Sequence, residues 1–301
     1  MIAVMGGAGN VGSKVADRLR DSGEAVRVLE HTRPLTSLRK RGAEVVRGDA
    51  MKGEDLLALF QGAAVALVLL PENVTDPQFV ENRSAIGRGI RDALRASAVS
   101  HVVALSAVGA SRSDAPGPPG GLHEFELDLA ELVDTNVLVL RSAAYMDYLL
   151  ASLPMIRDQG VNGSAVRADV PIPMVATQDV AREAADRLRL LDFTGYEVKP
   201  LLGPEDVTMA GATKAIGKHL GMPDLDYVEF PPDGVRAALV SAGMSEQVAG
   251  LLVAMQLAVN DGDYFEGVQR TDESTTPTRL EDFLTKALQV GERRANEGGP
   301  Q

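Results

Sequence analysis

The sequence of 301 residues contains no cysteine. This absence excludes disulfide bonds, thiolate catalysis and cysteine-ligated metal sites, and it fits a protein of the cytoplasm. Basic residues are scarce, since 30 Lys and Arg stand against 42 Asp and Glu, for a net charge of −12. Nucleic-acid backbones and anionic membranes are met by basic surfaces, so we expect no direct contact with nucleic acid and no membrane binding.

Long apolar runs are missing as well. The longest, Ala63–Leu70, is far shorter than the roughly 20 residues of a membrane-spanning helix. No basic segment precedes an apolar one near the first residue, so we expect no signal peptide. The length suits one large α/β domain or two modest ones.

Short apolar segments alternate with amphipathic ones along the first half of the chain. We expect strands at Ile2–Met5, Ala25–Leu29, Glu44–Val46, Ala63–Leu70, Val102–Leu105 and Val137–Leu140. Helices are expected between them, where Val11, Val15 and Leu19 recur on one face and at Glu54–Gln61, Gln78–Ser97 and Leu122–Val133. Strands without polar alternation, separated by helices, predict an α/β fold with a doubly wound parallel sheet covered on both faces.

The stretch MGGAGNVG joins the first strand to the first helix, with glycines at 6, 9 and 12. In this context Gly6 permits a sharp turn, Gly9 lets the backbone approach a pyrophosphate, and Gly12 lets helix and strand pack closely. Free N–H groups here, among them those of Asn10 and Val11, would face the phosphates. We interpret the stretch as a dinucleotide-binding turn, and the alternative is a tight turn without a ligand.

Regular elements continue in the second half of the chain. We expect helices at Asp179–Leu191 and Thr208–Leu220. Thr278 and Glu281 have the spacing of a capping box for a last helix. The apolar stripe of that helix consists of Leu280, Phe283, Leu284 and Leu288.

The glycine turn resembles the T-G-x-x-G-x-x-G motif of short-chain dehydrogenase/reductases. Later segments follow in the order seen in the NmrA-like group of atypical members, namely RGDA, HVVALSAVGA, VLRSAAYMDY, PIPMVATQDVAREAADRL and LLGPEDVTMAGATKAIGKHLG. The resemblance covers nearly the whole chain, and the part from GPEDVT to the end, with AGMSEQVA and TPTRLEDFL, is what resembles this group specifically. It implies a Rossmann domain at residues 1–150, rejoined by 178–203, and a smaller, mainly helical domain on the substrate side at 151–301.

The resemblance also implies contacts to the cofactor. Asp49 and Ala50, in GDA, are placed to meet the adenine, although Asp49 is equally suited to cap a loop. Ser106 ends a strand on the nicotinamide side. The ribose is expected to pass three residues at the end of the fourth strand, which are Leu69, Leu70 and Pro71; the two leucines also suit the core.

The end of the second strand, VRVLEHTRP, decides between NAD and NADP. Glu30 lies about 20 residues beyond the glycines, where a carboxylate accepts from both ribose hydroxyls and favours NAD. Family members that use NADP carry an arginine where this chain has His31, and Arg33, two residues further, is able to reach a 2′-phosphate. The pattern is split, and the resemblance favours NADP(H) over NAD(H).

The Tyr-x-x-x-Lys pair of short-chain dehydrogenases is absent, because no tyrosine has a lysine four residues on. NmrA-like quinone reductases carry instead a histidine, which His123 matches, and an acidic residue four positions later, where this chain has Leu127. Glu126 lies one residue early, on a different helical face. His123 is a candidate proton donor, or a helix-start histidine without function.

The resemblance assigns the aromatic–Met pair Tyr145 and Met146 to the substrate cleft, and Tyr148 follows on the same side. A core aromatic is the other reading of Tyr145. We expect the catalytic residues to be His123, Tyr145 and Ser106. The histidines are scattered, so no metal site is expected, and no G-x-S-x-G nucleophile turn occurs.

The segment 109–121, GASRSDAPGPPGG, leaves the carboxyl edge of the sheet, where ligands bind. It is either a substrate lid or an insertion without a role.

Two functions of different classes follow for the whole chain. The first is an NAD(P)H-dependent oxidoreductase that transfers hydride to a quinone-like or conjugated carbonyl small molecule. The second is a regulator that senses NAD(P) and acts through a protein partner without chemistry. A biosynthetic enzyme with an unusual reaction is a third alternative. We expect a cytoplasmic protein and a homodimer.

Overall fold

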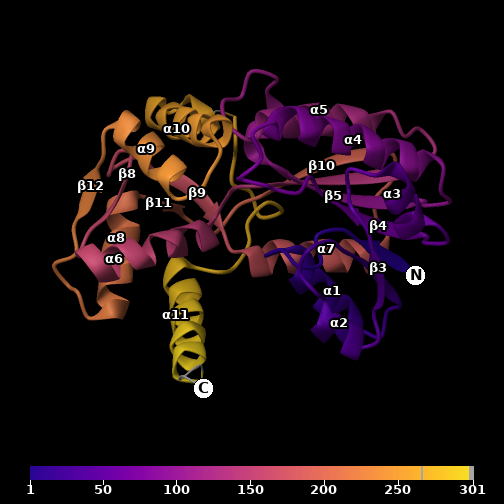
Figure 1. Cartoon of the computed structure of the whole chain (residues 1–301), viewed down its shortest axis with the longest axis horizontal. Helices are drawn as coiled ribbons and strands as arrows, with labels where there is room; N and C mark the ends of the chain where they lie inside the picture. The colour runs from indigo at the N-terminus through magenta and orange to yellow at the C-terminus, as the bar shows by residue number, and fades with distance from the viewer. Residues whose placement is uncertain (266, 298–301) are drawn as a thin grey trace.

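The computed structural model describes residues 1–265 and 267–297 and has two lobes, seen side by side in Figure 1. The larger lobe is built on a seven-stranded sheet with the order β10-β6-β5-β4-β1-β2-β3. Its strands all run parallel to their neighbours. They are β1 (Ile2–Val4), β2 (Val26–Glu30), β3 (Glu44–Arg47), β4 (Val65–Val68), β5 (His101–Ala107), β6 (Asn136–Ser142) and β10 (Tyr196–Leu201). This order, reversing between β1 and β4, confirms the predicted Rossmann-type fold.

Helices cover both faces of the sheet (Figure 1). One face carries α1 (Gly12–Asp21) and α7 (Thr177–Leu190), which pack on each other; the short α2 (Thr36–Lys40) follows β2. The other face carries α3 (Gly53–Phe60), α4 (Phe79–Arg95) and α5 (Gly120–Ala130). An apolar cluster fills each side, and all four residues of β4 are buried between the two. The strands lack polar alternation because helices cover both of their faces.

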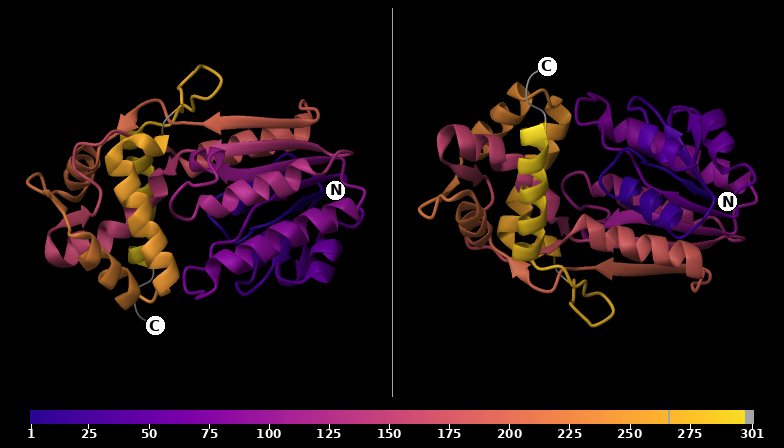
Figure 2. Two further views of the ribbon diagram at one scale, coloured as in Figure 1. Left: turned by 90° about the horizontal axis from the view of Figure 1, so that it is seen from above. Right: turned by 90° about the horizontal axis from the view of Figure 1, so that it is seen from below.

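The segment 178–203 returns to the larger lobe. There α7 packs on α1, and β10 pairs with β6 from Tyr196 to Leu201. Figure 2 shows α7 and β10 at one edge of the larger lobe, away from the rest of the second half of the chain. The boundary at residues 150 and 151 stays a prediction.

The smaller lobe is mainly helical, as predicted. It contains η2 (Met146–Ser152), α6 (Leu153–Gln159), α8 (Met209–Leu220), α9 (Pro232–Ser241), α10 (Glu246–Asp261), η3 (Asp263–Phe265) and α11 (Leu280–Glu297). Its strands are β7 (Ala144–Tyr145), β8 (Asn162–Ser164), β9 (Ile172–Val175), β11 (Asp206–Val207) and β12 (Tyr227–Glu229), paired as β11-β9-β7 and β12-β8. The predicted apolar stripe of α11 is buried in the core of this lobe.

The capping box predicted for α11 is wrong. The backbone N–H of Thr278 donates to Oδ2 of Asp179 at 3.0 Å, and its hydroxyl accepts from Nε2 of Gln178 at 2.9 Å. The helix begins after it, at Leu280. Thr278 therefore ties the start of α11 to the N-terminal turn of α7, a long-range contact that local spacing does not reveal.

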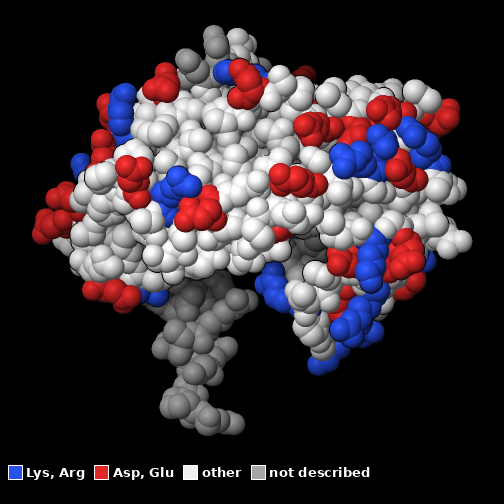
Figure 3. Space-filling model, turned by 45° about the horizontal axis from the view of Figure 1, so that its top comes forward, with Lys and Arg blue, Asp and Glu red and all other residues white. Residues whose placement is uncertain are grey.

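Within the described ranges, no helix has the length and apolar character needed to cross a membrane. On the face shown in Figure 3, Lys and Arg side chains are mixed with Asp and Glu and do not gather into a large basic area.

Candidate functional site

The glycine turn between β1 and α1 has the backbone that the sequence predicted. Gly6 has a φ of +69°, a left-handed conformation that favours glycine, and its carbonyl accepts from the N–H of Gly9 at 2.8 Å. A Cβ at Gly12 would lie 2.3 Å from the carbonyl oxygen of Gly6. No side chain fits there, so α1 packs directly onto the turn.

By contrast, no described side chain covers the outer face of the turn at Gly9. A Cβ at Gly9 would meet only the carbonyl oxygen of Gly6, at 3.3 Å. No side chain caps α1, and its first turn holds no acidic residue. The positive end of this helix therefore faces a surface shaped to take an anionic group such as a diphosphate.

Leu69 supports the turn from below. A Cβ at Gly6 would lie 2.7 Å from its Cδ2, so Leu69 occupies the space that the glycine leaves free. Leu70 is buried in the core, and Pro71 is half-buried. The three residues predicted at the end of the fourth strand thus follow β4, and Leu69 contacts the glycine turn.

Glu30, at the end of β2, has its carboxylate turned toward its own loop. Oε2 accepts from the backbone N–H of Leu35 at 2.7 Å, and Nη2 of Arg39 lies 3.6 Å from the same oxygen. One oxygen of the group predicted to bind ribose hydroxyls is therefore already engaged. Arg39 was missed by the sequence reasoning, since it lies on α2, outside the VRVLEHTRP segment.

Arg33 lies on the glycine turn, where its Nη2 donates to the carbonyl oxygen of Ala8 at 2.6 Å. His31 is 62% exposed, and its Nε2 lies 3.8 Å from Oδ2 of Asp49. The other oxygen of Asp49 accepts from the N–H of Met51 at 2.9 Å, which is the loop-cap role. Ala50 packs against the neighbouring apolar cluster. Arg33 and His31 thus lie on the β2 side of the turn, together with the carboxylates of Glu30 and Asp49.

Ser106 and Glu126 belong to a buried polar cluster with Arg141. The hydroxyl of Ser106 donates to Oε1 of Glu126 at 2.5 Å, and Arg141 donates to both carboxylate oxygens, with Nη2 to Oε2 at 2.6 Å. Glu126 and Ser106 are 4% and 5% exposed. The hydroxyl proton of Ser106 is thus engaged by Glu126, and the catalytic role of Ser106 stays a prediction. Leu127 points to solvent.

His123 is held by the segment 109–121. Its Nδ1 lies 2.9 Å from the carbonyl oxygen of Ala110. A carbonyl only accepts, so Nδ1 carries the proton and Nε2 remains for other partners. Because Glu126 faces away into the buried cluster, no carboxylate pairs with His123 among the described contacts.

The segment 109–121 packs against the smaller lobe. A Cβ at Gly109 would lie 2.8 Å from the hydroxyl oxygen of Tyr264, and one at Gly117 would lie 2.7 Å from Cβ of Met255 on α10. Gly117 has a φ of +93°. The segment thus bridges the two lobes and is tightly packed against the smaller one. A small cavity of about 140 Å³ opens here, lined by Gly109, Arg112, Ala115, Pro116, Ala258, Asp261 and Tyr264.

Tyr145 and Tyr148 lie together where the larger lobe passes into the smaller one, with ring centroids 5.7 Å apart. Burial raises the pKa of Tyr145 to about 12. Tyr148 is 54% exposed. Met146 points the other way and is fully buried in the core of the smaller lobe. Met146 therefore lies apart from the two tyrosines, and its place in the substrate cleft stays a prediction.

Lys14 connects the glycine turn to the smaller lobe. Its Nζ donates to the carbonyl oxygen of Asn10 at 2.7 Å and to Oγ1 of Thr177 at 2.9 Å. Thr177 donates in turn to Oδ1 of Asp147, at 2.8 Å. This chain of contacts joins residues far apart in the sequence, which no spacing rule predicts.

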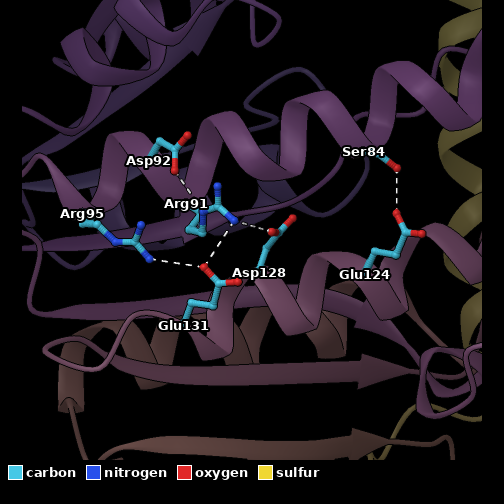
Figure 4. Close-up of polar contacts among 7 residues, drawn as sticks. All are labelled: Ser84, Arg91, Asp92, Arg95, Glu124, Asp128 and Glu131. Carbon is cyan, nitrogen blue, oxygen red and sulfur yellow. Dashed lines mark hydrogen bonds and ion pairs between the residues drawn. The ribbon is translucent and has the colours of Figure 1, made fainter.

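Ion pairs hold α5, and with it His123, against α4 (Figure 4). Arg91 contacts Asp92, Asp128 and Glu131, with Nη1 at 2.8 Å from Oδ1 of Asp128. Near the other end of the two helices, Ser84 donates to Glu124 at 2.8 Å. The same helix α4 carries a buried arginine, Arg83, that the sequence reasoning missed. It stands four residues after Phe79 and three before Ile86 on the apolar stripe, and that position was the available signal.

The described part of the chain brings no three His, Asp or Glu side chains together in a way that would hold a metal ion.

Residues 6–189 match the model of a family described as NAD(P)H-binding. The chain is 25% identical over 282 residues to an NAD(P)H azoreductase of Xenophilus azovorans, covering 92% of this chain and 93% of that protein. It is 37% identical over 111 residues to the NmrA-like family domain-containing oxidoreductase FrzB of Cladobotryum sp., covering 34% of this chain and 32% of that protein.

Solved structures share the fold over almost the whole chain. The NADPH-dependent quinone oxidoreductase QOR2 from Escherichia coli, complexed with NADPH, superposes with a TM-score of 0.78 at 23% identity, covering 96% of this chain and 100% of that one. NmrA, a negative transcriptional regulator in complex with NAD, gives a TM-score of 0.73 at 17% identity, covering 98% and 97%.

Proposed function

Since the chain belongs to the NAD(P)H-binding family and is an NmrA-like member of the atypical short-chain dehydrogenase/reductases, we propose that it reduces a conjugated small molecule with NADPH. The acceptor is of the quinone or azo type, as the names of an enzyme of each kind among its relatives and structural neighbours suggest. The observation that carries the proposal is the glycine turn, whose outer face is clear and whose inner face admits no side chain.

The nicotinamide cofactor supplies the hydride when bound. Gly6, Gly9 and Gly12 shape the surface for its diphosphate, with the N–H groups of Asn10 and Val11 at the start of α1. Leu69, Leu70 and Pro71 form the wall beside the ribose, and Asp49 and Ala50 the wall beside the adenine.

The β2 edge supports NADPH over NADH. The carboxylate of Glu30 accepts from the N–H of Leu35 and has Arg39 beside it, so it is less able to serve two ribose hydroxyls. Arg33, held on the turn by the Ala8 carbonyl, and the exposed His31 offer positive charge or hydrogen bonds to a 2′-phosphate.

Tyr145 and His123 are placed to serve the acceptor. The raised pKa of Tyr145 keeps its hydroxyl protonated at neutral pH, so it acts as a hydrogen-bond donor. The Nδ1 proton of His123 is held by Ala110, so the imidazole moves a proton only through Nε2. Tyr148 shapes the outer wall.

A conjugated acceptor suits a site whose candidate proton donors are Tyr145 and His123. Hydride addition to a quinone leaves a stabilised phenolate, which water or one donor protonates, so a strong acid is not needed. The tyrosine and lysine that lie three residues apart have other tasks. Tyr196 donates to the carbonyl oxygen of Glu126, and Nζ of Lys199 lies 2.6 Å from Oε1 of Glu183.

The test is oxidation of NADPH and NADH by the purified protein with a panel of quinones and azo compounds. We expect turnover with at least one conjugated acceptor and a lower KM for NADPH. Tight binding of NADPH without turnover on any acceptor would instead support the NAD(P)-sensing regulator, a function that the printed name of NmrA also suggests.

We further propose that the protein acts in the cytoplasm on a small molecule and forms a homodimer, which its mass in solution would test. The net charge of −12 supports the absence of direct nucleic-acid binding.

A further inference from the structure

Arg83 is a buried cation without a matching anion. It is 4% exposed, and its Nε has no hydrogen-bond partner among the described residues. Nη1 donates at 2.8 Å to the carbonyl oxygen of Pro118, a neutral group. No carboxylate in the described part of the chain forms an ion pair with it.

The surroundings of Arg83 add positive potential. A Cβ at Gly121 would lie 3.9 Å from its Nη1, so the guanidinium adjoins the N-terminal turn of α5. That helix has 11 residues, no acidic residue in its first turn and no side-chain cap. The ring of Phe79 lies 4.9 Å from the guanidinium carbon, a cation–π contact that attracts the cation without neutralising its charge.

Arg91 shows what an arginine of the same helix requires. It contacts three carboxylates, from Asp92, Asp128 and Glu131 (Figure 4). Arg83 is more deeply buried, and burial lowers its pKa more than the carboxylate of the exposed Glu72 raises it. A buried charge costs far more than an exposed one unless an anion compensates it, so the position calls for an anion from outside the chain.

The position adjoins the proposed acceptor site. Pro118, which Arg83 contacts, belongs to the segment 109–121, and Gly121 lies two residues before His123. Tyr148, whose ring meets that of Tyr145, lies within electrostatic reach of the guanidinium. A group bound by Arg83 would therefore belong to a molecule that also reaches His123 and Tyr145.

We propose that Arg83 binds a carboxylate or sulfonate of the acceptor, which takes the place of the Pro118 carbonyl, so that the protein favours aromatic acceptors bearing an acidic group. This inference rests on the proposed function for the identity of the site. The anionic group is part of the acceptor itself and is not formed by hydride transfer, because the buried guanidinium needs a negative charge beside it as soon as the acceptor binds. A protein of net charge −12 repels anions at long range, so a local cation is required to hold one.

The test measures binding to the protein loaded with NADP⁺, with 2-naphthalenesulfonate as the acidic probe and 2-naphthol as its neutral counterpart. Arg83→Met should weaken binding of the sulfonate by about 10- to 100-fold, the range for hydrogen bonds to charged groups, and change binding of naphthol less than about twofold. Arg83→Lys, which keeps the charge, should recover part of the affinity. Arg27→Met, on β2 where Arg27 pairs with Glu44, is the control and should alter neither affinity.

Thermal unfolding completes the test. Because Arg83 has no compensating anion, Arg83→Met should unfold at the wild-type temperature or above it, whereas Arg91→Met should unfold below it. Equal weakening of both probes together with a lower unfolding temperature would make Arg83 a support of the segment 109–121 and overturn the proposal. So would sulfonate binding that does not depend on Arg83. Neither probe is reduced, so a protein without reductase activity that still shows the Arg83-dependent preference would refute only the proposed function.

Discussion

Gly9 is the residue whose missing side chain matters most to the proposed cofactor and least to the fold. An added carbon would meet only the Gly6 carbonyl oxygen, at 3.3 Å, so Gly9→Val should fold while its methyl groups cover the surface for the diphosphate. We expect NADPH affinity by calorimetry to fall at least about tenfold. Gly12→Ala is the contrast, because its carbon would lie 2.3 Å from the same oxygen and should lower the unfolding temperature. Unchanged affinity in folded Gly9→Val would contradict the placement.

Arg33 decides how far the chain distinguishes NADPH from NADH. If its guanidinium contacts the 2′-phosphate, Arg33→Ala should weaken NADPH by about 1.5–3 kcal/mol and leave NADH nearly unchanged, as measured by titration of both cofactors. Arg41→Ala serves as the control, since Arg41 pairs with Asp17 and Asp21 on α1. Equal losses for both cofactors would show that Arg33 only braces the turn through Ala8.

At the scale of single residues, the sequence predicted backbone requirements better than side-chain partners. The steric need at Gly12 follows from a strand and a helix meeting in seven residues, which is local information. The hydrogen bond of Glu30 to Leu35 depends on the path of a loop, and Met146 is buried by residues of the smaller lobe that lie far along the chain. Neither follows from residue type and spacing.

The segment 109–121, which connects β5 to α5, is either a lid or an insertion without a role. A substitution at Gly117 distinguishes these two hypotheses. A side chain there would lie 2.7 Å from Cβ of Met255 and 3.2 Å from the carbonyl oxygen of Leu251. Gly117→Ala should keep the segment off α10. For a lid, we expect KM for the acceptor to rise about five- to tenfold with NADPH affinity unchanged, since overpacking of this kind costs about 1–3 kcal/mol.

Gly62→Ala is the matched control for the lid. Gly62 also has a positive φ, of +72°, but a side chain there would meet nothing within 4 Å. Both variants bear the backbone strain, and only Gly117→Ala disturbs the docking. Identical kinetics in the two variants would favour the insertion without a role.

The pairing of α7 with the edge strand β10 depends on pH through Glu183. Burial raises the pKa of this carboxyl group, but Lys199 and Arg187 outweigh burial and hold it below its ordinary value of 4.5. A lowered pKa means that the ionised form stabilises the fold above the unfolded-state pKa and that this contribution is lost as pH falls through the folded-state pKa. Glu183→Gln should cost about 1 kcal/mol at neutral pH and progressively less as pH falls below the ordinary value of 4.5, as measured by urea unfolding. Glu44→Gln, in an exposed pair with Arg27, should show a smaller effect at either pH.

For the whole molecule, the larger lobe could be predicted and the smaller lobe only in outline. Uninterrupted apolar strands such as Val65–Val68 predict a parallel sheet, because both faces of such a strand must be buried. The strands of the smaller lobe have two to four residues, too few to show a period. The contacts that join the lobes, such as Thr177 with Asp147, link distant parts of the chain.

Whether the protein is an enzyme or a sensor is tested at His123 and Tyr145, near the junction of the two lobes. Hydride transfer requires the acceptor within about 3–3.5 Å of the nicotinamide in a site sheltered from water. The structure offers His123, held by the segment 109–121, and Tyr145, which lies with Tyr148 where the lobes join. We expect His123→Ala and Tyr145→Phe each to lower kcat with a good acceptor by roughly tenfold or more, and to leave NADPH affinity intact because neither residue lies near the β2 edge. If both variants turn over like wild type, these side chains only shape the site and water protonates the product. If wild type binds NADPH tightly but oxidises it with no acceptor, the same site serves recognition instead of reduction, and the protein reports the bound cofactor to a partner.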